Sequence, residues 1–169
     1  VRYGNVMGSR GSVIPFFLSE VDKGILPITD KRMTRFMILL EEGIKLVWHA
    51  FDNMVGGEIY IKKIPSMKVT DIALAVSNKA EQKEVGIRPG EKLHEQMIGL
   101  EDALHTYEYP NYYKILPAIH NWSEDPGRIG NGTKVDQAFT YSSDNNSEWM
   151  QVEELKKWIK KNINKIGSI

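Results

Sequence analysis

Short apolar runs and amphipathic stretches alternate along the chain. Residues 1–7 are mostly apolar and predict a central strand covered on both faces, and residues 8–12 are rich in glycine and serine and predict a turn. Ser12 suits a helix N-cap, Pro15 suits the first helical turn, and Gly24 suits a helix stop. We therefore expect a strand, a turn and a helix within residues 1–24.

The clearest helical periodicity lies at residues 38–54. Apolar side chains recur there every three or four residues, with acidic and basic side chains on the other side, and two glycines follow at 56–57. The pattern predicts an amphipathic helix whose apolar stripe faces the core. That stripe consists of Leu40, Ile44, Val47, Phe51 and Met54.

Weaker patterns predict the remaining elements. The predicted strands are residues 26–29, 58–61, 83–87 and 112–116. The predicted helices are residues 69–76, with Ser66 as a possible cap, 91–98 and 152–163. Residues 121–137 have no periodicity and predict a long surface loop. Because strands alternate with helices, we expect the α/β class, in one domain that spans residues 1–169.

The amino-acid composition argues against several classes of function. The 22 basic and 22 acidic residues give a formal net charge of zero, which argues against a general binder of nucleic acid or anionic membranes. The chain has no cysteine, which excludes disulfides and thiolate zinc sites, and its four histidines have no metal-ligand spacing. No apolar run approaches the roughly 20 residues of a membrane span. These features predict no metal site and are consistent with a cytoplasmic protein.

Three polar segments are candidates for binding an anion. Asn5 precedes the first turn and Arg10 lies within it, Arg35 stands between Met33 and Phe36 where a guanidinium needs a partner, and Arg88 follows a predicted strand. The glycine spacing of the first turn matches neither the dinucleotide fingerprint nor the Walker pattern. An ordinary turn remains an alternative at each place.

Read together, these segments resemble one family. RYGNVMGSRGSVIPFF (2–17), LPITDKRMTRFMI (26–38), KIPSMKVTDIA (63–73) and VGIRPGEKLHE (85–95) are similar to the nucleotide-sugar 4,6-dehydratases of the extended short-chain dehydrogenase/reductase superfamily. The later TYEYPNYYKI (106–115) and FTYSSDNNSEW (139–149) match as well, so the resemblance covers nearly the whole chain. The branch most similar is that of inverting UDP-N-acetylglucosamine 4,6-dehydratases of pseudaminic acid biosynthesis.

The resemblance implies a part of a longer enzyme. In that family the strand similar to VRYGNV comes late in a Rossmann-type sheet, after a Gly-rich dinucleotide fingerprint and a Tyr-x-x-x-Lys pair, and this sequence contains neither motif. We therefore expect the C-terminal, substrate-binding portion of the fold, without the N-terminal dinucleotide-binding half and without catalytic residues. The parent enzyme would use NADP to move a hydride from sugar C4 to C6 as water leaves. The chain alone is expected to bind no cofactor and to be inactive.

The resemblance also assigns roles to residues. Tyr3 and Gly4 would lie near the nicotinamide. Arg35 and Arg88 would clamp the diphosphate, and Glu91 would accept a hydrogen bond from the ribose. The other residues expected to contact the UDP-sugar are Asn5, Ser9, Arg10, Gly11, Ser12, Val13, Pro15, Thr29 and Met33.

Two alternatives stay open at this point. One is a dehydratase–epimerase of fucosamine-type capsule biosynthesis, whose corresponding loop resembles ASRGS, whereas Gly8 follows Met7 here. The other is a stand-alone binding module without a catalytic parent. The expected partners are a UDP-sugar, the missing half and further copies in a homo-oligomer, with no nucleic acid and no membrane.

Overall fold

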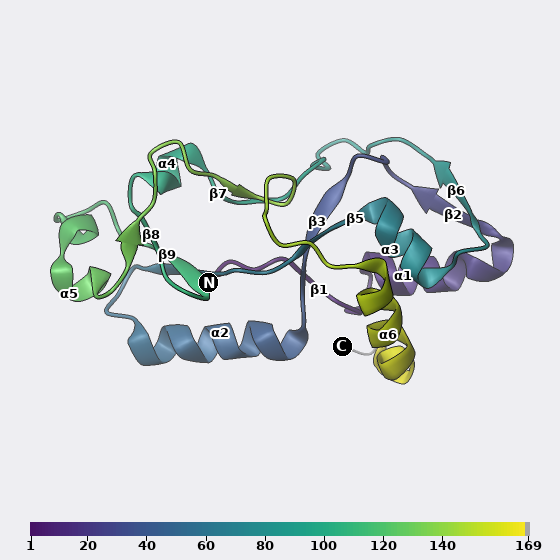
Figure 1. The fold of residues 1–169 in the computed structure, drawn as a ribbon, viewed down its shortest axis with the longest axis horizontal. Coiled ribbons are helices and arrows are strands. Elements are labelled where there is room, and N and C mark those ends of the chain that lie inside the picture. Colours follow the sequence, from purple (N-terminus) through teal and green to yellow (C-terminus); the bar gives the residue numbers. More distant parts are fainter. Residues whose placement is uncertain (168–169) are drawn as a thin grey trace.

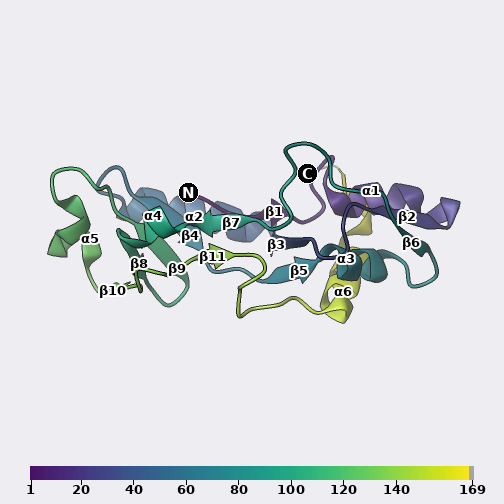
Figure 2. The ribbon, with the colours of Figure 1, turned by 90° about the horizontal axis from the view of Figure 1, so that it is seen from above.

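The computed structural model describes residues 1–167 and has an elongated, mixed α/β fold. Figure 1 shows α2 (Leu40–Asn53) and the strands around it at one end and the short helices α1 (Val13–Glu20) and α3 (Val69–Val76) at the other. Extended segments connect the two ends, and the view from above in Figure 2 shows the same division. The α/β class expected from the sequence is confirmed.

Three strands form the sheet at the centre of the molecule. β3 (Thr34–Ile38) pairs in parallel with β1 (Asn5–Val6) and antiparallel with β5 (Ser66–Lys68), so β3 is the middle strand. Four of its five residues are buried, as expected of a strand with neighbours on both sides. The sequence analysis predicted neither β3 nor β5: it placed no element between the strand expected at 26–29 and the helix expected at 38–54, and none between 61 and the helix expected at 69–76.

The expectation for residues 1–7 is only partly met. The strand is limited to Asn5–Val6, with one isolated parallel bridge from Arg2 to Ile61. Val1 and Tyr3 are 49% and 45% exposed, so the predicted burial on both faces is wrong for this segment. The apolar side chains at these positions have no covering layer among the described residues.

A second sheet, of four strands in the order β10-β8-β9-β4, lies beside α2. β4 (Ile59–Lys62) and β9 (Tyr112–Ile115) agree with the predicted strands, and β8 (Thr106–Glu108) was not predicted. The segment 121–137, expected to be a surface loop, contains three short elements and buries the side chains of Ser123 and Arg128. These elements are η2 (Trp122–Glu124), α5 (Pro126–Ile129) and β10 (Thr133–Lys134).

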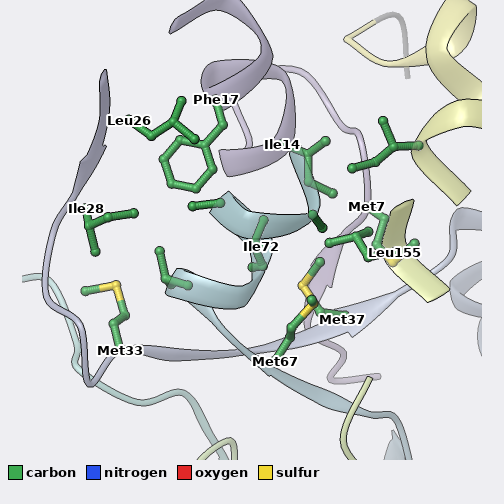
Figure 3. Close-up of a cluster of buried hydrophobic side chains, with 14 residues drawn as sticks. Met7, Ile14, Phe17, Leu26, Ile28, Met33, Met37, Met67, Ile72 and Leu155 are labelled. Carbon is green, nitrogen blue, oxygen red and sulfur yellow. The ribbon is translucent and has the colours of Figure 1, made fainter. Parts of the chain in front are cut away.

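A compact apolar core underlies the end of the molecule that contains α1 and α3 (Figure 3). Phe17 of α1, Ile72 of α3 and Leu155 of α6 (Val152–Asn162) are each at most 1% exposed. β2 (Ile25–Ile28) adds Leu26 and Ile28 and pairs in parallel with β6 (Glu81–Glu84). The helices expected at residues 69–76 and 152–163 are therefore confirmed. α3 begins after Lys68, so Ser66 does not cap it.

Two further predicted elements differ from the structure. The strand expected at 83–87 is β6 at 81–84, and the helix expected at 91–98 is a turn followed by β7 (Gln96–Ile98). β7 pairs with β11 (Tyr141–Ser142), which returns from far along the chain. Long-range pairing of this kind leaves no local signal. The remaining short elements are η1 (Val21–Lys23), α4 (Leu100–Ala103) and η3 (Ile163–Lys165).

The orientation predicted for the helix at 38–54 is wrong. Leu46 and Ala50 of α2 are buried against Tyr60 of the second sheet, and Gly43 is buried near Ile38 of β3. The predicted core stripe instead contributes to an exposed apolar surface, which we call the α2 apolar face. It comprises Leu40, Ile44, Trp48, Phe51, Met54 and Val55, which are 37–66% exposed.

Candidate functional site

A cavity of about 510 Å³, here called the main cavity, opens between the first turn, β2, β3 and the loop after β6. All of the predicted substrate-binding residues except Ser9 and Arg10 line it. Those that do are Asn5, Gly11, Ser12, Val13, Pro15, Thr29, Met33, Arg35, Arg88 and Glu91. The structure therefore brings together segments that are up to 86 residues apart, from Asn5 to Glu91.

The first turn forms one wall of the main cavity. Ser9 N–H donates to the carbonyl of Val6 at 3.3 Å, and Ser12 N–H and Oγ both donate to the carbonyl of Ser9, at 3.1 and 2.7 Å. Ser12 is the N-cap of α1, but its hydroxyl turns back into the turn and accepts no bond from the helix. Gly8 and Gly11 have positive φ angles of 75° and 72°, which explains why the turn requires glycine at these positions.

Arg35 reaches from β3 along the edge of the main cavity. Its Nη1 donates to the carbonyls of Thr34 and Leu93, at 2.7 and 3.1 Å, and its Nη2 donates to that of Lys92 at 2.9 Å. The carboxylates of Glu91 and Glu95 stand 3.9 and 3.5 Å from the guanidinium. Burial lowers the pKa of Arg35, and the two carboxylates oppose this shift. The anionic partners that this arginine was expected to need are thus present within the chain, and its contact with a diphosphate stays a prediction.

Arg88 differs from Arg35 because its side chain is free. Its backbone N–H donates to Glu91 Oε2 at 3.3 Å, and Glu91 N–H donates to the carbonyl of Arg88 at 3.0 Å, which closes a tight turn. Within residues 1–167 the Arg88 guanidinium makes no hydrogen bond or ion pair. An exposed, unpaired guanidinium at the mouth of a cavity is suited to bind an anionic ligand.

The residues expected near the nicotinamide line a second cavity, of about 490 Å³. Tyr3 and Gly4 lie there beside Gln96 and Met97, and Asn5 borders both cavities. Gly4 has a structural reason for lacking a side chain, since a Cβ would stand 2.4 Å from Cβ of Phe36. That contact accounts for the glycine through the close approach of β1 to β3.

Sequence reasoning missed four apolar residues of the main cavity. Phe16, Phe17, Pro27 and Val69 also line it. Phe17 and Val69 belong to the core cluster shown in part in Figure 3, so the apolar wall of the cavity is continuous with the core. The helical spacing could have indicated Phe16 as a wall residue, because it lies four residues after Ser12 and residues four apart share a helix face. Among the described residues, no His, Asp and Glu side chains gather in a group suited to a metal ion.

Comparison with known protein families shows which family the sequence matches. Residues 1–117 match the model of a family described as "Polysaccharide biosynthesis protein". The chain belongs to this family. The match includes every residue of the main cavity and ends before the segment of 121–137.

Two of the similar curated proteins are named as different enzymes, a dehydratase and an epimerase. The chain is 53% identical, over 161 residues, to "UDP-N-acetylglucosamine 4,6-dehydratase (inverting)" of Campylobacter jejuni serotype O:2, covering 91% of this chain and 48% of the relative. It is 34% identical to a "UDP-glucose 4-epimerase" of Rickettsia akari, covering 92% and 47%. The resemblance to the 4,6-dehydratases is thereby confirmed. The chain spans about half the length of the curated relatives it matches.

A solved structure agrees with the fold. The X-ray structure of Pen from Bacillus thuringiensis matches with a TM-score of 0.78 and 30% sequence identity. The match covers 95% of this chain and 48% of that one. No helix among the described residues has the length and apolar character required to cross a bilayer.

Proposed function

We propose that this chain is the nucleotide-sugar-binding part of a UDP-N-acetylglucosamine 4,6-dehydratase that inverts C5. The observation that supports this most directly is the main cavity, where the free Arg88 guanidinium stands with Arg35 and Glu91 beside the glycine-rich turn. Two guanidinium groups suit a diphosphate, a carboxylate suits ribose hydroxyls, and the apolar wall suits a heterocyclic base. The 53% identity to an enzyme of that name supports the same substrate.

The chemistry of the parent enzyme belongs to this proposal. NADP would carry the hydride between C4 and C6, and the product would be a 4-keto-6-deoxy sugar nucleotide for pseudaminic acid biosynthesis in the cytoplasm. Only Tyr3 and Gly4 of this chain would approach the nicotinamide. The Gly-rich fingerprint and the Tyr-x-x-x-Lys pair do not occur in the sequence, so we expect the chain alone to be inactive.

Calorimetric titration with UDP tests the binding role. We expect wild type to bind and Arg88→Ala to bind at least about tenfold more weakly, since a hydrogen bond to a charged group contributes roughly 1.5–3 kcal/mol. Lys79→Ala is the matched control, because it also removes one positive charge and Lys79 is exposed and lies outside the main cavity. A folded wild-type chain that binds no UDP would contradict the proposal.

The α2 apolar face indicates where the rest of the enzyme would pack. Trp48 and Phe51 are 64% and 65% exposed, and a patch of this kind usually marks an interface. The curated relatives extend over about twice the length of the match, so they contain a part that this chain does not span. We assign this face to contact with the dinucleotide-binding half.

Co-purification tests this assignment. The chain, expressed with the part of the Campylobacter jejuni relative that it does not span, should form a complex that Trp48→Glu with Phe51→Glu abolishes and Glu41→Gln preserves. Glu41 is an exposed residue of the same helix outside the apolar face. Concentration-dependent self-association that the same double variant removes would instead assign the face to a second copy of this chain, as in a homo-oligomer.

A further inference from the structure

Arg88 and Glu91 lie on a turn that has little support of its own. All residues from 85 to 90 are exposed, and the only hydrogen bonds within the turn are the two that join Arg88 and Glu91. Gly86 and Gly90 have φ angles of 91° and 81°, and glycines leave the backbone free to move. The position of the Arg88 guanidinium over the main cavity therefore depends on how the ends of this turn are attached.

The first attachment is simple. Val85 N–H donates to the carbonyl of Ile28, at the end of β2, at 2.8 Å. The second attachment, at residues 92–95, uses several groups of β3. Thr34 N–H donates to the carbonyl of Leu93 at 3.2 Å, and Arg35 donates to the carbonyls of Lys92 and Leu93.

Ser143 completes the second attachment from a distant part of the chain. Its N–H donates to the carbonyl of Glu95 at 2.8 Å, and its Oγ accepts from the N–H of Glu95 at 2.9 Å. Ser143 is fully buried, and it follows β11, whose pairing with β7 brings it here. The residues around Ser143 thus bind the backbone next to the Arg88 turn without lining the main cavity.

Three side chains connect these backbone contacts. Thr34 Oγ1 lies 2.7 Å from Nδ1 of His94 and 2.7 Å from Oγ of Ser143. Ser143 Oγ is also 3.2 Å from the carbonyl of Thr34. The two hydroxyl protons can be arranged so that each hydroxyl both donates and accepts, whichever way the His94 ring is protonated. Thr34 is 3% exposed, so these bonds form in a setting where an unpaired group is costly.

We propose that Thr34, His94 and Ser143 are positioning residues that hold the turn of Arg88 and Glu91 in place and so set the affinity for the nucleotide diphosphate. None of the three lines the main cavity. The nature of the ligand rests on the proposed function, whereas the attachment of the turn does not. The consequence is that the C-terminal segment around Ser143 contributes to the site through the backbone of residues 92–95.

Thr34→Val and Thr34→Ser test this inference as a matched pair. Valine keeps the shape of threonine and removes the hydroxyl, and serine keeps the hydroxyl. We expect Thr34→Val to weaken UDP binding by about three- to tenfold, the size of one net hydrogen bond, and to speed amide exchange in residues 86–95 but not in β4 or β9. Thr34→Ser should retain both properties of wild type. Equal losses in the two variants would overturn the inference.

A double-mutant cycle separates positioning from a general structural effect. If Thr34 acts by positioning the turn of Arg88 and Glu91, Thr34→Val should weaken UDP binding clearly less in an Arg88→Ala background than in wild type, because only the contribution of Glu91 is left to lose. Additive losses would contradict action through Arg88. Should Thr34→Val fail to fold, Ser143→Ala replaces it, with Ser142→Ala as the control, because the Ser142 hydroxyl bonds only to Asp144.

The amide-exchange measurement tests the attachment of the turn independently of whether the chain binds UDP. A wild-type chain that binds no UDP would end the proposed binding role, and exchange in residues 86–95 would then decide the attachment alone. Unchanged exchange in Thr34→Val would refute it. Faster exchange confined to this segment would support it.

Discussion

Removal of Arg128 tests the ion pair that fixes the segment of 121–137 to the second sheet. Arg128 Nη1 stands 2.8 Å from Glu58 Oε1, and the two side chains are 7% and 2% exposed. The same nitrogen donates to the carbonyl of Gly56 at 2.8 Å, and the guanidinium carbon lies 4.0 Å from the ring centre of Trp122. Arg128→Ala would leave the Glu58 carboxylate buried without its cation.

The expected loss follows from this burial. Breaking a buried pair on one side costs about 3–5 kcal/mol, because the carboxylate loses its cation and stays buried, although the N–H groups of Val55 and Gly56 still donate to it. For a domain of this size each kcal/mol lowers the midpoint of thermal unfolding by about 2–4 °C, which gives a decrease of roughly 6–20 °C. Burial raises the pKa of Glu58, but backbone N–H groups, including those of Gly56 and Val55, and then Arg128 outweigh it and leave the pKa lowered.

Thermal unfolding followed by circular dichroism at neutral pH is a sufficient assay. Arg10→Ala is the control for loss of one arginine charge, because Arg10 is exposed. Glu58→Gln in the Arg128→Ala background should recover part of the midpoint, since it removes the unpaired charge. A decrease of less than about 3 °C in Arg128→Ala would refute the reasoning, because it would mean that water reaches Glu58 or that the pair adds little.

Three further predictions concern the main cavity and the strands and turns around it. Hydrogen bonds from the Arg32 side chain and backbone lower the pKa of Asp30 from 3.8 to about 2. The ionised Asp30 therefore stabilises the fold fully above about pH 4, and this contribution is lost as the pH falls through about 2. The difference in unfolding midpoint between wild type and Asp30→Asn should shrink on acidification, and a constant difference would disprove this role of Asp30. Gly4→Ala places a Cβ 2.4 Å from Cβ of Phe36 and should cost about 1–3 kcal/mol in urea unfolding. Gly43→Ala, in the interior of α2, places its Cβ 3.9 Å from the nearest atom, Cδ1 of Ile38, and should stabilise by up to about 1 kcal/mol. A tolerated Gly4→Ala would show that β1 and β3 are not held this close. Arg35→Ala should both weaken UDP binding and speed amide exchange in residues 92–95, whereas Arg88→Ala should weaken binding alone; similar exchange in the two variants would contradict the separate roles given to them.

The parts of the fold that the sequence predicted correctly are those with a local cause. The 3-10 turn η1, which follows α1, ends at Gly24, whose φ of 73° only glycine adopts easily, and α6 has its apolar residues Leu155 and Ile159 on one buried face. Ten of the fourteen residues that line the main cavity were among the residues expected to contact the UDP-sugar, because they lie in short motifs that a family resemblance can match one by one. Their gathering in one cavity is what the structure adds to that prediction.

The parts that could not be predicted depend on distant partners. A helical period shows that α2 has an apolar side, but it does not show which of two apolar sides meets the sheet, and here Leu46 and Ala50 do. Residues 91–98 contain apolar side chains at spacings that a helix also uses. Their extended form comes from pairing with β11 and from Ser143, nearly fifty residues further along the chain. Neither partner is visible in a local window of sequence.

β3, which the sequence analysis missed, joins these features physically. Thr34 enters the cluster with His94 and Ser143, and Phe36 is buried against β1 and the aromatic ring of Tyr141, 4.7 Å away. Arg35 is the one residue of the strand that is not fully buried, and its guanidinium bonds to the loop backbone at 92 and 93. Because the core fixes the strand and the strand fixes the loop, the position of the free Arg88 guanidinium follows from packing well outside the cavity.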